Sequence, residues 1–374
     1  MTAFVVGAFL LVLTDFDHLS KLGTDPLGAI GGAFDLVVRG YTAMFTGAIG
    51  DPGKIATAVQ GGNERDIAKA IRPITEALLF TTPVIFITLG VGLALHARLF
   101  NFGANGQFAM GAFGSLLTAN LLGAVLPPTL VLVVAISMGT LFGAAYGFLP
   151  GLLKARTGAH EVITTLMLNT LTGLFQYLIL LGLAGLATPS AQPPSQPRDL
   201  PQVPRIFDIE TIRLDWGFIV ALVLAAAVSF VLFRTNLGFE LRATGHSFTA
   251  ARSAGMQPQR ATILALTLSG GIIGMGAAFL ALGPAGGRAG TGAGFVALAL
   301  AMIAGLRPAG IVLTCLLYGA LNNGAKSMVI ETGTPLDVLD VVIAITLMFV
   351  AAPGMIRSIW RLKPQLPDRV VVET

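Results

Sequence analysis

Long stretches without Asp, Glu, Lys or Arg recur along the chain. One such charge costs about 2.5 to 3.5 kcal/mol at the centre of a membrane-spanning helix, so charge-free stretches mark candidate spans. They cover residues 77–97, 99–153, 162–197, 216–233, 261–287, 289–306, 308–325 and 341–356. Because one span needs about 20 apolar residues, residues 99–153 hold two helices, divided at Pro127 and Pro128.

Together with the apolar start of the chain, this pattern predicts an all-α polytopic membrane protein of about ten helices, forming one domain over residues 1–374. The expected helices are 1–14, 74–97, 106–125, 129–150, 161–184, 216–233, 261–281, 291–306, 308–324 and 337–352. The first is short, and we expect it to be retained. A cleaved signal peptide is the alternative, but no basic segment precedes the apolar run.

Composition supports the membrane class. Hydrophobic residues make up 54% of the 374 residues and charged residues 11%, whereas soluble domains carry about 25% charged residues. The net charge of +4 comes without any basic block that would neutralise phosphates, so no nucleic-acid partner is expected. The lone Cys315 excludes an intrachain disulfide and a CxxC pair.

The distribution of Lys and Arg predicts the orientation. With a cytoplasmic N-terminus and ten alternating helices, twelve of the 23 basic residues fall inside. Nine of the other eleven lie in the long external loops 15–73 and 185–215, and long loops cross the membrane largely regardless of charge. Both termini are therefore expected to be cytoplasmic, as are the loop 235–260 and the tail 353–374.

The long loops differ in character. Residues 15–73 are too polar to span and too apolar for a floppy linker, so we expect them to fold against the outer face. Six prolines between residues 189 and 204 prevent a continuous helix in the second external loop. That loop either meets a binding partner or is an inert surface connection.

The internal loop 235–260 contains a candidate docking helix. Residues 248–255 can form about two helical turns, with Phe248, Ala250 and Ala251 along them, Arg252 at the edge and Gly255 as C-cap. Such a helix on the membrane surface offers a compact docking site. The alternative is a basic loop, including Arg242, held by anionic membrane lipid.

Two glycine-rich segments, 101–114 and 283–294, follow the second and the seventh predicted helix. Each comes after the first helix of a five-helix half, and alternation places them at opposite membrane faces. Glycine interruptions at corresponding positions of two halves indicate inverted repeats with broken helices and a pathway at their interface. Close helix packing is the alternative use of glycine.

The sequence contains few groups that perform chemistry. It has no P-loop, HExxH, CxxC or GxSxG, and its four histidines are scattered, so neither catalysis nor a metal site is expected. The spans almost lack carboxylates, which disfavours coupling to protons or sodium. Amides and aromatic rings remain to line a path for a neutral, hydrogen-bonding solute. These candidates are Asn101, Phe102, Asn105, Gln107, Phe108 and Asn169. Alternatively, the amides satisfy helix breaks and hold helices together.

Four ordered motifs carry a family resemblance. They are LFNFGANGQFAMGAFG, GLLKARTGAHEVITTLMLN, GFELRATGHSFTAARSAGM and AGLRPAGIVLTCLLYGALNNGAKSM. In this order and spacing, over residues 74–352, they resemble the permease subunits of bacterial ABC importers in the branched-chain amino acid, ribose and simple-sugar class. Within that class they are most similar to nucleoside-type permeases that work with a basic-membrane-protein lipoprotein.

The resemblance implies a multi-pass permease of the bacterial inner membrane that transports by alternating access. It implies a second related permease, two cytoplasmic ATPase subunits that bind ATP and Mg²⁺, and an external substrate-binding lipoprotein; no cofactor is expected on this chain. It identifies residues 242–256 as the coupling helix that docks into the ATPase. The implied solute is a nucleoside, with a simple sugar or a branched-chain amino acid as alternatives. The alternative to an ATP-driven importer is an ion-coupled secondary transporter. Asn105 stands where family members commonly carry an acidic residue. This difference weakens the inference of substrate identity from the family.

Overall fold

The structure is a computed structural model that describes residues 2–15, 20, 23–182, 201–206, 209, 212–284, 293–335 and 341–345. The described residues form helices and no β-strand; the one isolated β-bridge among them pairs Arg205 with Asp215. The chain divides into two units, residues 1–44 with 325–374 and residues 45–324. The candidate site lies in the second unit.

The first unit contains α1 (Thr2–Thr14) and most of α3 (Pro26–Ile49). Gly7 of α1 lies against Tyr41 of α3 and against Val342, which belongs to the short helical stretch 341–345. The predicted first helix is confirmed. The rest of the predicted helix 337–352 and the tail 353–374 lie outside the described residues.

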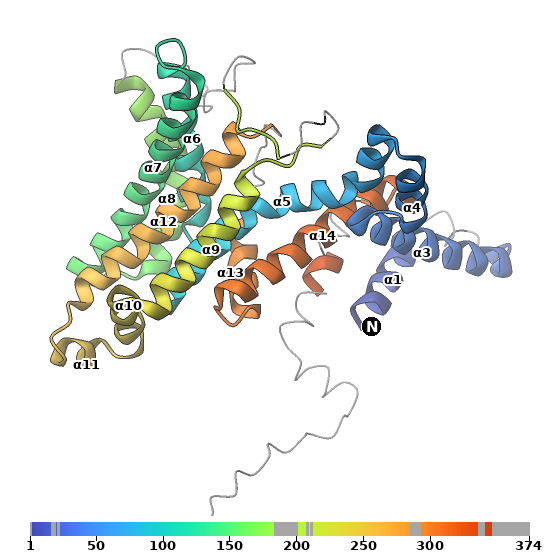
Figure 1. Ribbon diagram of the computed structural model, residues 1–374. Helices are drawn as coiled ribbons and strands as arrows, with labels where there is room; N and C mark the ends of the chain where they lie inside the picture. The colour runs from blue at the N-terminus through green and yellow to red at the C-terminus, as the bar shows by residue number, and fades with distance from the viewer. Residues whose placement is uncertain are drawn as a thin grey trace, which may run out of the picture. The chain divides into compact units, whose positions relative to one another are not determined.

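The second unit is a bundle of helices in which α12 lies beside α7, α6 and α5 (Figure 1). In chain order the helices of this unit are α4 (Pro52–Gly61), α5 (Glu64–His96), α6 (Ala104–Leu122), α7 (Pro128–Thr157), α8 (Glu161–Gly182), α9 (Gly217–Arg234), α10 (Asn236–His246), α11 (Phe248–Ser253), α12 (Pro258–Leu282), α13 (Ala293–Ile303) and the first part of α14 (Pro308–Thr332). Five described helices, α5, α7, α8, α9 and α12, are long and apolar enough to span a membrane, and α13 is a shorter apolar helix.

Glycine allows the closest helix contact in the bundle. Gly139, Gly143 and Gly147 recur every fourth residue on one face of α7, and a Cβ on Gly143 would meet the backbone of Gly270 and Gly274 in α12. Without side chains between them, the two backbones approach closely, as small residues at fourfold spacing permit in membranes. This close contact fixes α12 against α7.

Three helices are longer than predicted. α5 begins at Glu64, ten residues before the expected start, and continues through Pro73. Proline removes one helical hydrogen bond, but its φ is compatible with a helix. The α14 residue Asn323 contacts this part of α5: its Nδ2 donates to the Pro73 carbonyl at 3.0 Å and to the Gly47 carbonyl at 2.8 Å. α7 likewise continues through Pro150, and α14 extends to Thr332.

Three helices, α3, α4 and α10, occupy parts of the chain expected to be loops. Residues 15–73 include the 24-residue α3 as well as α4, so this segment is folded, as predicted. α10 was not foreseen within the loop 235–260. Thr235 caps it by accepting from Gly238 N at 3.3 Å, Leu241 is buried, and a Cβ on Gly238 would meet the α9 backbone, so glycine lets the chain turn tightly here.

The segment before α9 is fixed to the far end of the bundle, opposite α10 and α11. Arg213 donates to both carboxylate oxygens of Glu76 in α5, at 2.9 and 2.6 Å. Asp215 Oδ1 accepts from Gly217 N at 2.8 Å at the start of α9, and its carboxylate lies beside Gly283. Burial raises the pKa of Asp215 to about 6 because water no longer solvates its charge.

Candidate functional site

Two helices, the 19-residue α6 and the 11-residue α13, begin at the same place inside the bundle. Asn105, in the first turn of α6, accepts a hydrogen bond from Gly294 N, in the first turn of α13, at 2.9 Å. A Cβ on Gly294 would lie 3.0 Å from the Ala104 Cβ. Ala104 is fully buried with Ala297 in one apolar cluster. The N-termini of α6 and α13 therefore meet in the interior.

From this meeting point the two helices run in opposite directions. Gly111 of α6 lies against Gly274, and further along Ser115 lies near Ala278, so α6 runs toward the C-terminal end of α12. α13 runs toward the end with α10 and α11, where the Leu306 carbonyl meets His96 Nε2 at 3.0 Å. The positive dipole ends of both helices converge between them.

A buried pair of amides holds the segment that leads into α6. Asn101 Nδ2 donates to Gln107 Oε1 at 2.8 Å, and Gln107 Nε2 donates back to Asn101 Oδ1 at 3.2 Å. Asn101 also donates to Ser269 Oγ, near the middle of α12, at 2.8 Å. Both amides are 1% exposed. Their polar groups are used within the fold, and they fix the break at mid-depth of the bundle.

Asn169 of α8 closes the same break from the other side. Its Nδ2 donates to the Phe102 carbonyl at 2.7 Å, and its Oδ1 accepts from Gly106 N at 2.8 Å. The amide thus satisfies a carbonyl of the loop and one of the free N–H groups of the first turn of α6.

Aromatic rings border the break on its accessible side. The Phe100 and Phe102 rings stack at 6.2 Å between centroids, and Phe102 lies 5.7 Å from Phe295 of α13. Phe100 is 40% and Phe295 50% exposed, whereas Phe108 is buried in the apolar cluster. We call Phe100, Phe102 and Phe295 the aromatic strip. With the half-buried Asn105 beside it, the strip offers ring faces and an amide without a formal charge.

The structure brings the predicted pathway residues together but gives them unequal exposure. Asn101, Gln107 and Phe108 are buried, while Phe102, Asn105 and Asn169 are partly exposed. Ser269 and Phe295 were missed, because neither has a local signal: Ser269 belongs to a long apolar helix, and Phe295 to an apolar helix that follows a glycine-rich segment. Most of the second glycine-rich segment, residues 285–292, lies outside the described residues.

The predicted docking helix is present at one end of the bundle as α11. Ser247 caps it by accepting from Ala250 N at 3.3 Å, and Gly255 ends it with φ +81°. Ala251 is 3% exposed and anchors the helix, while Phe248, Ala250 and Arg252 are exposed. α11 therefore presents a small surface with one cation on it.

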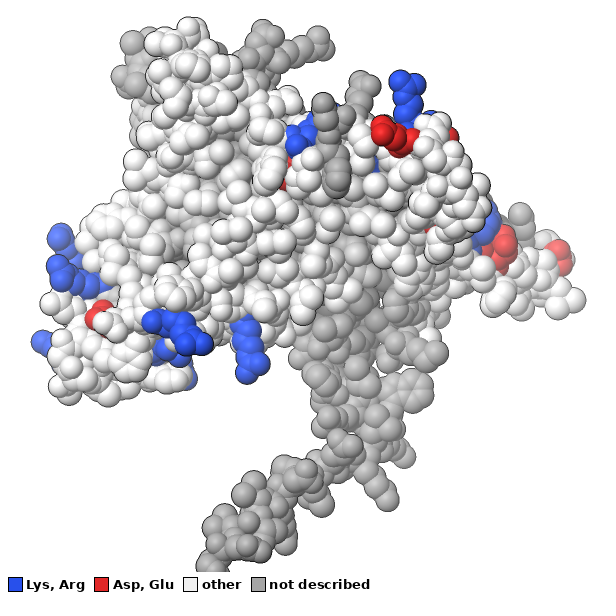
Figure 2. All heavy atoms as spheres, in the orientation of Figure 1, with Lys and Arg blue, Asp and Glu red and all other residues white. Residues whose placement is uncertain are grey.

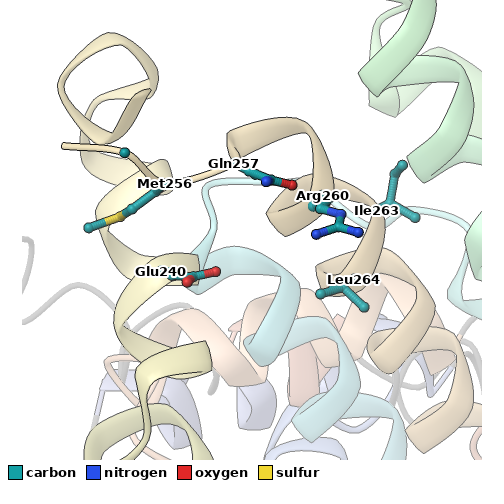
Figure 3. Close-up of a pocket in the computed structure, with 7 residues that line it drawn as sticks. Glu240, Met256, Gln257, Arg260, Ile263 and Leu264 are labelled. Atoms are coloured by element: carbon teal, nitrogen blue, oxygen red, sulfur yellow. The ribbon is translucent and has the colours of Figure 1, made fainter. Parts of the chain in front are cut away.

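A groove of about 500 Å³ runs beside α11, between α10 and α12. Figure 3 shows Glu240 of α10 and Arg260 of α12 directed toward this space, with Met256 and Leu264 at its edges. Figure 2 shows Lys and Arg gathered over this end of the bundle, with few acidic residues among them. The groove has an apolar wall and one group of each charge.

The described part of the site contains no metal-binding chemistry: no cluster of three or more His, Cys, Asp or Glu occurs among the residues placed by the structure. The sequence has no charged residue between Leu99 and Leu153, which includes the whole approach to α6. The described residues of this arrangement offer hydrogen-bonding groups and ring faces to a solute.

Comparison with known proteins shows what the chain resembles. Residues 74–351 match the family described as branched-chain amino acid transport system / permease component. The chain is 32% identical over 329 residues, 86% of its length and 88% of the relative, to the guanosine ABC transporter permease protein NupP of Bacillus subtilis (strain 168). It is 30% identical to the nucleoside ABC transporter permease protein NupB of Lactococcus lactis subsp. cremoris (strain MG1363), covering 76% of this chain and 80% of the relative. A glucose ABC transporter permease protein of Haloferax volcanii is 27% identical, with 74% and 75% covered.

Proposed function

The chain belongs to the family of branched-chain amino acid transport system permease components, and from this premise we propose that it carries a nucleoside through the membrane as part of an ATP-driven importer. One observation carries the proposal. Two relatives, named for guanosine and nucleoside transport, match the chain at 32% and 30% identity over most of its length. The protein is a multi-pass membrane permease, and we assign it to the bacterial cytoplasmic membrane.

The meeting point of α6 and α13 is the proposed solute path. A nucleoside is neutral, carries a ring that stacks on aromatic faces and has hydroxyl and base groups that hydrogen-bond. The aromatic strip and Asn105 supply matching groups, and the positive dipole ends of two helix N-termini favour the acceptor atoms of the solute. Asn101, Gln107 and Asn169 hold this arrangement in place, and Phe108 packs behind it.

The energy for transport enters through other subunits. In the proposed mechanism, ATP and Mg²⁺ bind to two cytoplasmic ATPases, whose closure moves α11 and shifts this chain and a second, related permease between inward-open and outward-open packings. Arg242, Phe248, Ala250, Ala251, Arg252 and Gly255 form the coupling region. Nucleotide binding acts by favouring one of two packings, so the permease itself needs no catalytic residue.

This assignment sets the topology. The end with α10 and α11 is cytoplasmic, as are both termini, and the end with Arg213 and Asp215 faces outward, where a substrate-binding lipoprotein delivers the solute. The excess of Lys and Arg around α10 and α11 supports this direction. Asp215 would then lie in the external loop.

A sugar is the second candidate, because the 27% identical relative from Haloferax volcanii is named for glucose. Its lower identity and coverage place it behind the nucleoside. A branched-chain amino acid has only the family description in its favour. Coupling to an ion gradient has the least support, since residues 99–153 and the central part of α12 contain no carboxylate.

Uptake with competitors tests the substrate class. Cells carrying the complete transport system are given labelled guanosine together with unlabelled adenosine, ribose, glucose or leucine. We expect adenosine to compete and the others not to. Phe102→Ala should reduce uptake, whereas Phe230→Ala, which removes a 61% exposed ring on α9, should not. Competition by glucose or ribose alone would replace the nucleoside with a sugar.

A further inference from the structure

A second cleft, of about 660 Å³, opens at the end of the bundle that carries α10 and α11. It is separate from the groove beside α11. Its lining consists of Leu95, His96, Arg98, Phe239, Arg242, Ala243, His246 and Leu306. Two of these side chains are arginines and none is acidic, so the cleft is suited to an anion.

The backbone around this cleft is strained. Arg98, with φ +53°, and Leu306, with φ +60°, are the two non-glycine residues with positive φ in the described chain, and both line the cleft. This conformation costs an L-residue about 1 to 2 kcal/mol. His96 Nε2 joins the two segments through the Leu306 carbonyl at 3.0 Å. Strained residues persist where the surrounding structure fixes them, and they cluster at ligand sites.

The guanidinium of Arg242 is held in position. Its central carbon lies 5.2 Å from the centre of the Phe233 ring, and its Nε donates to the Gly238 carbonyl at 3.3 Å. No ion pair joins Arg98 or Arg242 to a carboxylate among the residues placed by the structure. Charge-assisted hydrogen bonds from two such groups favour a phosphate oxygen strongly.

Apolar side chains adjoin these cations. Phe239 is 56% exposed and Phe233 43% exposed, and Leu95 and Leu306 form part of the wall. A soluble phosphate would leave these rings uncovered, whereas the acyl chain of a lipid would cover them. We propose that this cleft binds the phosphate group of an anionic phospholipid, with its acyl chain over Phe233 and Phe239. This site is independent of the transported solute.

Native mass spectrometry of the purified protein with added phosphatidylglycerol, phosphatidylcholine or inorganic phosphate tests the site. Arg98→Gln together with Arg242→Gln should weaken phosphatidylglycerol binding about 30-fold, the effect of two basic groups. Arg98→Lys with Arg242→Lys keeps both charges and should bind phosphatidylglycerol more tightly than the Gln double variant does. The matched control, Arg156→Gln with Arg234→Gln, removes two exposed arginines outside the cleft and should bind as the unmodified protein does.

Two measurements on the unmodified protein test the lipid site without any variant. Phosphatidylcholine binding as tightly as phosphatidylglycerol would overturn the site. Inorganic phosphate displacing phosphatidylglycerol at equal concentration would assign the cleft to a soluble phosphate instead. Unchanged phosphatidylglycerol binding in the Gln double variant would also overturn the proposal.

Discussion

At the scale of single residues, the amides around α6 act on the backbone first. Helix breaks inside a membrane leave N–H and C=O groups without water, and each unpaired group is costly there. Asn169 satisfies one group of each kind, and Asn105 satisfies the first turn of α13. A solute-binding role for Asn105 therefore depends on the part of its amide that remains accessible.

Replacing Asn169 by Leu is expected to destabilise the folded protein by about 2 to 4 kcal/mol, because the Phe102 carbonyl and Gly106 N–H lose their partner. Thermal unfolding in detergent measures this. Thr170→Leu is the matched control on the same helix, since Thr170 bonds only to the Met167 carbonyl of α8. An equal loss of stability in both variants would show that the amide bonds are unimportant.

Asp215 makes stability depend on pH. Its pKa of about 6 in the folded state, above the ordinary 3.8, means that folding disfavours the charged carboxylate. Protonation of Asp215 therefore stabilises the folded state relative to the unfolded state. This stabilisation develops as the pH falls through about 6 and is complete below 3.8. Asp215→Asn keeps an acceptor for Gly217 N and should raise stability at pH 8 by up to about 3 kcal/mol.

The difference between Asp215→Asn and the unmodified protein should narrow by roughly half between pH 8 and pH 5. Melting curves of both proteins in detergent across this range give the result. A difference that stays constant with pH would show that Asp215 is already ionised at its ordinary pKa.

At the scale of elements, α11 is short but defined at both ends. Ser247 begins it, Gly255 ends it, and buried Ala251 attaches it to the bundle. A force applied to its exposed side is therefore passed to α10 and α12. This geometry suits a helix that transmits the movement of a partner, as the proposed coupling requires.

Arg252→Glu reverses the one charge on α11 and is expected to reduce nucleoside uptake at least about tenfold, the effect of losing roughly 1.4 kcal/mol of coupling. ATP hydrolysis by the assembled complex should continue. Arg156→Glu is the control, because it reverses the charge of a likewise exposed arginine on another helix, in the last turn of α7. Normal uptake in Arg252→Glu would contradict the coupling assignment.

Some of these helices were predicted accurately from the sequence, and others were missed. Charge-free stretches located α6, α8, α9 and α12 to within four residues, because burial in lipid excludes charge over the length of a span. The start of α5 was missed because residues 64–76 carry six charged side chains, so this stretch does not read as a span. The Asn323 contact with the Pro73 carbonyl comes from 250 residues away. α10 is amphipathic, short and polar, so its hydropathy resembles that of a loop.

The candidate site was predictable in composition but not in geometry. Glycine-rich segments pointed to broken helices, and the amides and phenylalanines beside them were recognised. No local pattern indicated that Asn105 caps α13 across 189 residues, or that Phe295 completes the aromatic strip. Such pairings depend on how α6 and α13 pack, which one sequence does not reveal.

At the scale of the whole molecule, the spans are nearly free of charge and the described site has no reactive group. A conduit of this kind transports against a gradient only when another component supplies energy. The Lys and Arg around α10 and α11 give a partner a surface on which to act. These features fit one part of a larger transporter.

Reconstitution into liposomes tests whether the permease depends on ATP hydrolysis by partner subunits. The permease is assembled with its related permease, the ATPase subunits and the lipoprotein, and labelled guanosine uptake is measured with and without ATP on the cytoplasmic side. We predict uptake only with ATP and the ATPases, and none from a proton or sodium gradient. Guanosine accumulation by the permease alone, driven by an ion gradient, would contradict the account.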